Sequence, residues 1–308
     1  MCDIWKADNS KREISVETLA AHISAFKKLR VREVVLSGGE ALMHSNLWKF
    51  CALLRENNIR VTLLSTGLLL KKHAAEIIKH ISNVIVSLDG TEAVHDRIRN
   101  IPNGFAKLVE GITTLKSINP DFRITGRCVL QRFNFHDFIN IVIAARAIGL
   151  DQISFLAADV STTAFNRPLP WTEDRLGDIA LNAAETSRFE TIVAQSFIEL
   201  KEEYQSRFIA ESMSRMNNIV QYYKAVNSMG DYPPVVCNAP WVSAVIESDG
   251  SVLPCFFHKP YGNIYSNDFL EVVNSPLARE FRRGLDVNEN EICRKCVCSL
   301  KLAPHQMR

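Results

Sequence analysis

The sequence predicts an α/β protein: a partial parallel barrel of the (β/α)6 type that lacks its first strand, followed by a small cysteine-rich α+β domain. Short apolar runs alternate with amphipathic stretches through the first half, and five of the eight cysteines lie in the last quarter. Alternating strands and helices imply right-handed βαβ units and hence a parallel sheet. A closed eight-unit barrel needs about 200 to 250 residues, so a first half that ends near residue 160 indicates a partial barrel.

The expected strands are short and rich in β-branched residues, as buried parallel strands are. They cover Glu33–Ser37, Arg60–Ser65, Val84–Leu88, Phe122–Leu130 and Gln152–Leu156. The stretches between them have helical periodicity, and the first one places Leu19, Ile23 and Phe26 on one apolar face. Five strand–helix units therefore follow one another.

The chain divides into three parts. We expect the barrel at residues 1–160, a mostly helical connector or cap at 161–232, and the cysteine-rich domain at 233–308. Pro168 and Pro170 mark the first break, and Pro233-Pro234 mark the second. In the last part, Asp249-Gly250 lies between two apolar runs, which predicts a β-hairpin.

Composition limits the function. The formal net charge is only +2 and no apolar run reaches 18 residues, so we expect no nucleic-acid partner and no membrane span. The first residues have no signal-peptide layout, and a cytoplasmic protein is expected. Cysteines in such a protein act as ligands or reactive thiols more often than as disulfides. Cys51 and Cys128, which lie among apolar residues, are expected in the core.

Gly38-Gly39-Glu40 follows the first predicted strand, at the barrel end where active sites form. Two glycines let the backbone approach a ligand closely, and the carboxylate can hold an ammonium group. A strand-to-helix turn with a solvated glutamate explains the tripeptide equally well. The motif alone does not decide between the two interpretations.

The C-terminal cysteines form a metal-binding pattern. Cys237 and Cys255 bracket the hairpin, and Cys293 and Cys296 form a Cys-x2-Cys pair. Four thiolates satisfy either a [4Fe–4S] cluster or a structural zinc ion, and the spacing alone leaves both open. Cys298 is a spare thiol that can replace Cys296 as the fourth ligand.

Motifs at three further positions complete a recognisable order. Cys2 lies upstream of the glycine pair, Ser65-Thr66-Gly67 ends the second predicted strand, and Ser87-Leu88-Asp89-Gly90 ends the third. This order resembles the radical S-adenosylmethionine (SAM) superfamily, and the C-terminal spacing resembles members that carry a SPASM or twitch extension. The resemblance implies that the C-terminal cysteines hold one auxiliary [4Fe–4S] cluster.

The resemblance also implies roles for residues at the barrel end. Gly38, Gly39 and Glu40 would bind the amino group of SAM. Ser87 and Asp89 would face the cofactor, and Arg127 would bind its carboxylate. Cys2 corresponds to the last of three loop cysteines that hold a SAM-binding [4Fe–4S] cluster.

That SAM-binding cluster is incomplete in this chain, because the two earlier loop cysteines are absent and one thiolate cannot hold it. The start is placed too late, the chain is truncated, or the chemistry is lost; we expect a late start, since Asp3-Ile4-Trp5-Lys6 continues the family pattern.

The expected function is reductive cleavage of SAM to a 5′-deoxyadenosyl radical that abstracts hydrogen from a peptide or small metabolite. An electron donor such as a flavodoxin or ferredoxin is implied. The alternative is a degenerate, non-catalytic scaffold protein that binds one iron–sulfur cluster or zinc. A zinc-stabilised α/β enzyme with another cofactor would make Gly38–Glu40 a coincidence.

Overall fold

The computed structural model describes residues 12–164, 167, 169 and 171–303. Its main sheet is parallel and five-stranded, in the order β1-β2-β3-β4-β5. The strands are β1 (Glu33–Leu36), β2 (Arg60–Ser65), β3 (Asn83–Ser87), β4 (Ile124–Leu130) and β5 (Gln152–Ala157). Each predicted strand is confirmed to within two residues at either end, and the predicted partial barrel is confirmed with them.

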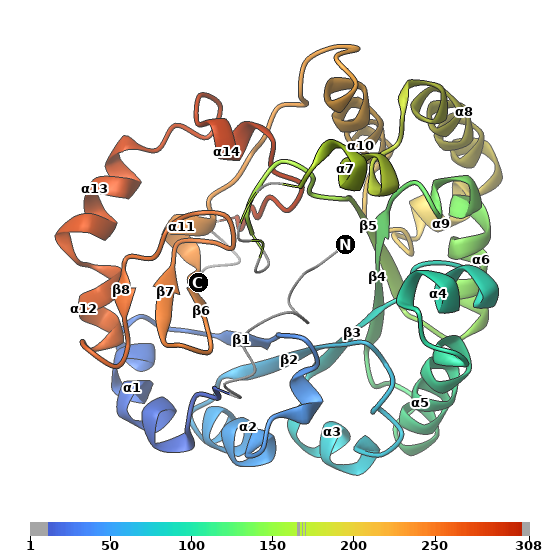
Figure 1. Ribbon diagram of the computed structural model, residues 1–308. Helices are drawn as coiled ribbons and strands as arrows, with labels where there is room; N and C mark the ends of the chain where they lie inside the picture. Colours follow the sequence, from blue (N-terminus) through green and yellow to red (C-terminus); the bar gives the residue numbers. More distant parts are fainter. Residues whose placement is uncertain (1–11, 165–166, 168, 170, 304–308) are drawn as a thin grey trace.

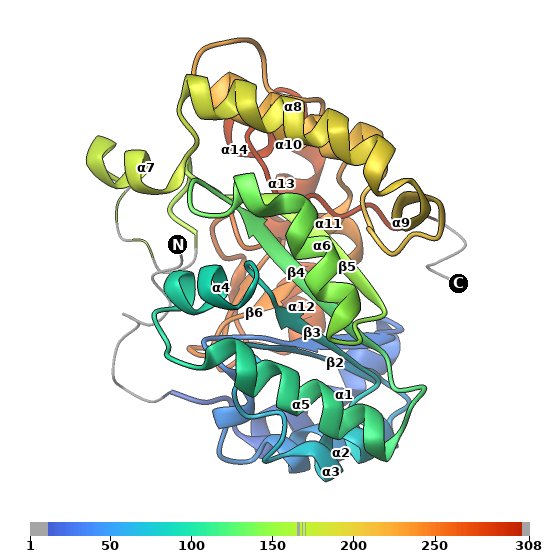
Figure 2. The ribbon, with the colours of Figure 1, turned by 90° about the vertical axis from the view of Figure 1, so that its right-hand side faces the viewer.

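The helices that precede and follow the strands in the sequence cover the outer face of the curved sheet (Figures 1 and 2). They are α1 (Val16–Lys28), the short η2 (Ala41–Met43), α2 (Leu47–Glu56), α3 (Ala74–His80), α4 (Glu92–Arg99), α5 (Gly104–Ile118), η3 (Phe135–Asp137) and α6 (Phe138–Ala147). Alternate strand residues such as Leu63 and Val86 are fully buried in the core. Strand geometry turns their neighbours to the opposite face, the barrel interior. There Val35 is half exposed and Ser87 is partly exposed.

The segment from residue 171 to 226 is mostly helical. It holds α7 (Glu173–Ile179), α8 (Ala183–Glu199), α9 (Lys201–Gln205) and α10 (Met213–Val226). Between α9 and α10 the chain runs parallel to β5, where Ile153 donates to Phe208 O at 2.8 Å and Ala210 donates to Ile153 O at 2.9 Å. This short segment satisfies backbone groups at the edge of the sheet.

The C-terminal region carries a small antiparallel sheet in the order β6-β7-β8. Its elements are α11 (Ala239–Val242), β6 (Val245–Ile246), β7 (Ser251–Leu253), β8 (Gly262–Asn263), α12 (Phe269–Val273), α13 (Pro276–Gly284) and α14 (Glu291–Arg294). The predicted hairpin is confirmed as β6 and β7. Gly250 has a φ of +83° in its turn, and a Cβ there would lie 2.5 Å from the Tyr265 ring, so this position requires glycine.

This C-terminal region packs against α1, beside the β1 edge of the main sheet, and lies across the barrel from β4 and β5 (Figure 1). His22 Nε2 lies 3.1 Å from Ile264 O, and Phe269 donates its amide to His22 Nδ1 at 3.3 Å. The rings of Phe26 and Phe269 meet edge to face at 5.1 Å. Since Nδ1 accepts a hydrogen bond, Nε2 carries the proton and donates to the carbonyl. Both imidazole nitrogens thus hold the two regions together.

Within the described residues, no helix combines the length and the apolar character that crossing a membrane requires.

Candidate functional site

The Glu40 carboxylate is held at the C-terminal ends of β1 and β2. Its Oε2 accepts hydrogen bonds from the Thr66 amide at 2.8 Å, the Thr66 hydroxyl at 2.5 Å and the Ser65 hydroxyl at 3.0 Å. Its Oε1 accepts from the Leu42 amide at 3.2 Å, which caps η2. Four hydrogen-bond donors hold the carboxylate in one position, where it can bind an ammonium group. The Glu40 carboxylate is therefore held in a fixed position at this end of the barrel.

The two glycines before Glu40 leave the backbone open. Gly38 has a φ of +134°, which L side chains rarely adopt, whereas Gly39 has an ordinary φ and, among the described residues, no heavy atom within 4 Å of where a Cβ would lie. Packing against the described part of the chain does not explain glycine at position 39. An open backbone beside a fixed carboxylate fits the close approach of a ligand.

Ser87 and Arg127 lie side by side on the same barrel end, because they are paired in the register of β3 and β4. Arg127 is paired on its other side with Ser154 of β5, and its Nε lies 3.5 Å from the Ser154 hydroxyl. All three residues are partly exposed. The row supplies hydroxyl donors and one cation to the barrel interior, which suits a carboxylate ligand.

Asp89 is not placed at the barrel mouth as predicted. Its side chain is 1% exposed, and its Oδ2 accepts a hydrogen bond from Arg99 Nε of α4 at 2.5 Å. Its backbone carbonyl accepts from Asn134 at 2.8 Å, and its amide donates to His95 Nδ1 at 3.2 Å. The ion pair turns the carboxylate into the protein, because a buried carboxylate needs a partner. Asp89 therefore braces the loop after β3.

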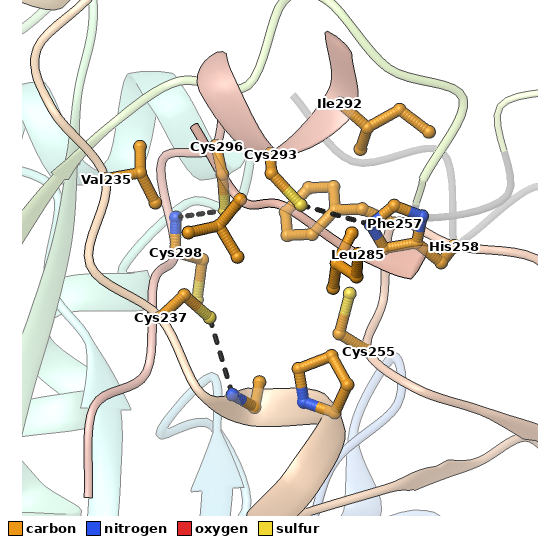
Figure 3. Close-up of a pocket in the computed structure, with 13 residues that line it drawn as sticks. Val235, Cys237, Cys255, Phe257, His258, Leu285, Ile292, Cys293, Cys296 and Cys298 are labelled. Carbon is orange, nitrogen blue, oxygen red and sulfur yellow. Dashed lines mark hydrogen bonds between the residues drawn. The ribbon is translucent and has the colours of Figure 1, made fainter. Parts of the chain in front are cut away.

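Five cysteines gather around one pocket in the C-terminal region (Figure 3). They are Cys237, Cys255, Cys293, Cys296 and Cys298, and they come from the start of the region, the loop after β7, α14 and the segment after α14. The rest of the lining is mostly apolar. The structure thus brings together every C-terminal cysteine that the sequence predicted, while Cys51 and Cys128 are fully buried core residues as expected.

The cysteine donor set of this pocket is the kind that holds an iron–sulfur cluster or a zinc ion. Four thiolates that share one zinc crowd around it with bonds of about 2.3 Å. In an iron–sulfur cluster each thiolate binds a different iron atom, so the thiolates surround a group larger than a single ion. The donor set and the pocket between the donors fit a [4Fe–4S] cluster.

Backbone amides point at the sulfurs through a repeated local turn. Cys237 Sγ accepts from the Ala239 amide at 3.5 Å, and Cys296 Sγ accepts from the Cys298 amide at 3.4 Å. Cys255 accepts from the amides of the second and third residues after it. In three of the cysteines, therefore, the sulfur accepts a hydrogen bond from the backbone amide of the second residue after that cysteine. Such donors stabilise thiolates and help to orient them toward a metal.

Burial keeps the thiols protonated until a cation reaches them. Burial raises the pKa of Cys296 to about 12 and that of Cys293 to about 11. It also raises the pKa of Cys255 and of Cys298. Iron must therefore displace the protons as it binds. These cysteines have the character of ligands and not of free nucleophiles.

His258 also lines this pocket, although its position close after Cys255 in the sequence favoured a surface role over one facing the cluster or the substrate. It is 8% exposed, and its Nε2 lies 3.3 Å from Cys293 Sγ (Figure 3). Burial lowers its pKa, which favours a neutral ring. Its place three residues after Cys255 was the available signal, but the contact with Cys293 spans 35 residues.

The positive charge of Arg127 acts on one thiol of the cysteine pocket, Cys298. Burial raises the pKa of Cys298, and the positive charge of Arg127 acts in the opposite direction. An arginine on β4 therefore acts electrostatically on a thiol of the cysteine pocket. Cys2, the remaining predicted ligand, lies outside the described residues.

Two family profiles match the chain. The family described as the radical SAM superfamily matches residues 1–144, and the SPASM iron–sulfur cluster-binding domain matches residues 237–297. The chain is 25% identical to the subtilosin biosynthesis protein AlbA of Bacillus subtilis, over 85% of this chain and 53% of that protein. It is 24% identical to the PqqA peptide cyclase of Ruegeria pomeroyi, over 92% of this chain and 72% of that protein.

An AdoMet-dependent heme synthase of Nitratidesulfovibrio vulgaris is 25% identical over 44% of this chain, and the match covers 38% of that protein. The chain thus spans between about two fifths and three quarters of the length of these relatives.

Solved structures share the fold. Native anSMEcpe with bound AdoMet superposes with a TM-score of 0.63 at 16% identity, covering 96% of this chain and 84% of that chain. Streptococcus suis SuiB bound to its precursor peptide SuiA gives 0.62 at 14% identity, covering 97% and 68%. The two matched domains imply [4Fe–4S] clusters and SAM as cofactors. The chain thus carries a radical SAM domain over residues 1–144 and a SPASM iron–sulfur cluster-binding domain over residues 237–297.

Proposed function

We propose that this chain is a radical SAM maturase that acts on a peptide or a small metabolite. The observation that carries the proposal is the placement of the Glu40 carboxylate and the open Gly39 backbone at the same barrel mouth as Arg127, which acts on the cysteine pocket. One relative is named a PqqA peptide cyclase, and the solved SuiB structure holds a precursor peptide. A reductant such as a flavodoxin or ferredoxin would supply the electrons.

The residues at the mouth would bind and orient SAM. Glu40 would hold the ammonium group of its methionine part, while Arg127 and Ser87 would bind the carboxylate by charge and hydrogen bonding. Gly39 would let the backbone lie against the ligand. A SAM-binding [4Fe–4S] cluster, when bound, supplies the electron that cleaves SAM to methionine and the 5′-deoxyadenosyl radical.

The cysteine pocket would hold the auxiliary cluster across the mouth from Glu40. Cys237, Cys255, Cys293 and Cys296 are the proposed ligands, because an N–H or the His258 imidazole lies at hydrogen-bond distance from each of these sulfurs. Cys298 would stay a free thiol beside them. Arg127 would then lie between SAM and this cluster, where the substrate is expected to bind.

Anaerobic SAM cleavage tests the function. The chain would be compared with a form extended at its N-terminus, so that Cys2 completes a Cys-x3-Cys-x2-Cys loop. With dithionite, the extended form is expected to produce 5′-deoxyadenosine and methionine, while the chain with Cys2 alone binds SAM without cleaving it. An extended form that binds a full set of irons and SAM yet yields no 5′-deoxyadenosine would favour the scaffold alternative.

A further inference from the structure

We propose that His258 donates a hydrogen bond from Nε2 to the Cys293 thiolate and thereby raises the reduction potential of the auxiliary cluster, a role that depends on the cluster assigned to this pocket. The histidine comes from the loop after β7, and the cysteine lies in α14. Their side chains meet at 3.3 Å inside the pocket (Figure 3).

The imidazole is fixed by its surroundings. Only 8% of His258 is exposed, and its ring packs edge to face on Phe281 of α13, with the centroids 4.9 Å apart. Phe281 in turn packs on the Tyr261 ring at 5.7 Å. A buried ring packed against Phe281 loses little entropy when it forms a hydrogen bond.

In the contact between His258 and Cys293, the imidazole is the hydrogen-bond donor and the sulfur is the acceptor. A thiolate bound to iron has no proton and acts only as an acceptor, so the proton of this contact belongs to His258 Nε2. The backbone amide of the same residue donates to Cys255. His258 therefore contacts two proposed ligands from different parts of the chain and ties the hairpin to α14.

A hydrogen bond to a ligand sulfur stabilises the more reduced state of a cluster, because each added electron increases the negative charge on the sulfurs. Loss of the donor therefore lowers the potential. The donors to Cys237 and Cys296 are backbone amides, which side-chain substitution leaves in place. The imidazole donor can be removed without touching a ligand.

The test uses three substitutions in the full chain, each in a Cys2→Ala background so that the C-terminal cluster alone is observed. His258→Phe keeps a ring against Phe281 and removes the donor. His258→Gln restores an N–H donor. Phe281→Leu is the matched control, since it loosens the packing and keeps the imidazole. Iron and sulfide per chain and the midpoint potential from an EPR-monitored redox titration would be measured for each.

We expect a more negative potential in His258→Phe, partial recovery in His258→Gln, and a smaller change in Phe281→Leu. An unchanged potential in His258→Phe overturns the role, and so does an equal shift in the phenylalanine and glutamine variants. If His258→Phe loses its cluster, pulsed EPR is applied to the reduced parent protein labelled with 15N in the histidine imidazole rings alone, because the His258 backbone amide also contacts a ligand sulfur. A histidine nitrogen coupling supports the hydrogen bond, and its absence refutes it. A parent protein without iron and sulfide would refute the cluster itself.

Discussion

Thr66 donates both its backbone amide and its hydroxyl to Glu40 Oε2, at 2.8 Å and 2.5 Å. The two residues follow neighbouring parallel strands, β1 and β2, whose C-terminal ends meet at one edge of the sheet. The pair connects the glycine motif with the end of the next strand. It fixes the carboxylate before any ligand binds, and such preorganisation lowers the cost of binding.

Substitution of Thr66 by valine removes the hydroxyl donor and leaves the amide. Because one hydrogen bond to a charged group contributes about 1.5 to 3 kcal/mol, SAM affinity is expected to fall by roughly tenfold to 150-fold. Equilibrium dialysis with labelled SAM measures it. Thr114→Val is the control, since the Thr114 hydroxyl bonds only the Glu110 carbonyl within α5. Equal affinity in both variants would contradict the role of the hydroxyl.

Alanine at position 39 is expected to block ligand approach without unfolding the protein. Gly39 has an ordinary φ, and no heavy atom of the described residues lies within 4 Å of where its Cβ would be, so the described fold tolerates the methyl group. SAM affinity should fall by at least about tenfold, or ~1.4 kcal/mol. Gly177 in α7 has equally open surroundings among the described residues, and Gly177→Ala is the matched control. Normal SAM binding by Gly39→Ala would place the ligand elsewhere.

Serine substitutions separate Cys296 from Cys298. Cys296→Ser is expected to lose most of its iron and sulfide, since it removes a proposed ligand whose sulfur accepts an amide hydrogen bond. Cys298→Ser should keep about four irons per chain. Iron and sulfide assays after anaerobic purification check both. The reverse result, with iron lost only in Cys298→Ser, would make Cys298 the ligand.

The free energy of unfolding is expected to depend on pH because of the buried Glu211 carboxyl. Burial raises the pKa of this carboxyl from 4.5 to about 7, although it accepts the Phe155 amide at 2.8 Å. Between these values the folded state keeps a proton that the unfolded state loses, so stability falls as pH rises. Glu211→Gln removes the ionisation and should be more stable than the parent above pH 7, by at most about 3 kcal/mol.

The gain from Glu211→Gln should shrink toward pH 5 and vanish below about pH 4.5, where the carboxyl is protonated in both the folded and the unfolded state. Urea unfolding at pH 5, 6, 7 and 8 measures the difference. The same difference at every pH would show that Glu211 carries its charge in the folded protein and that its burial costs little.

Much of the fold could be predicted from the sequence because strands and turns are local. The apolar run Arg60–Ser65 predicted the bounds of β2, and the Asp249-Gly250 turn predicted the hairpin of β6 and β7. The cysteine spacing likewise predicted one shared site, and the five thiols do line one pocket. The three-part division of the chain and the ligand set stay predictions.

Other features depend on contacts that spacing does not encode. Asp89 fits a motif residue facing the cofactor, yet the Arg99 guanidinium draws its carboxylate into the protein. His258 resembles a surface residue until α13 and α14 pack over it. In both cases a buried polar side chain interacts with a side chain from another element. The periodicity of the sequence does not show which side chain that is.

Metal analysis tests the central claim most directly. The Cys2→Ala chain, purified without oxygen, is assayed for iron, acid-labile sulfide and zinc. About four irons and four sulfides per chain, with little zinc, are predicted for a [4Fe–4S] cluster in the pocket of Cys237, Cys255, Cys293 and Cys296. One zinc per chain without sulfide would contradict the auxiliary cluster and the proposed role of His258.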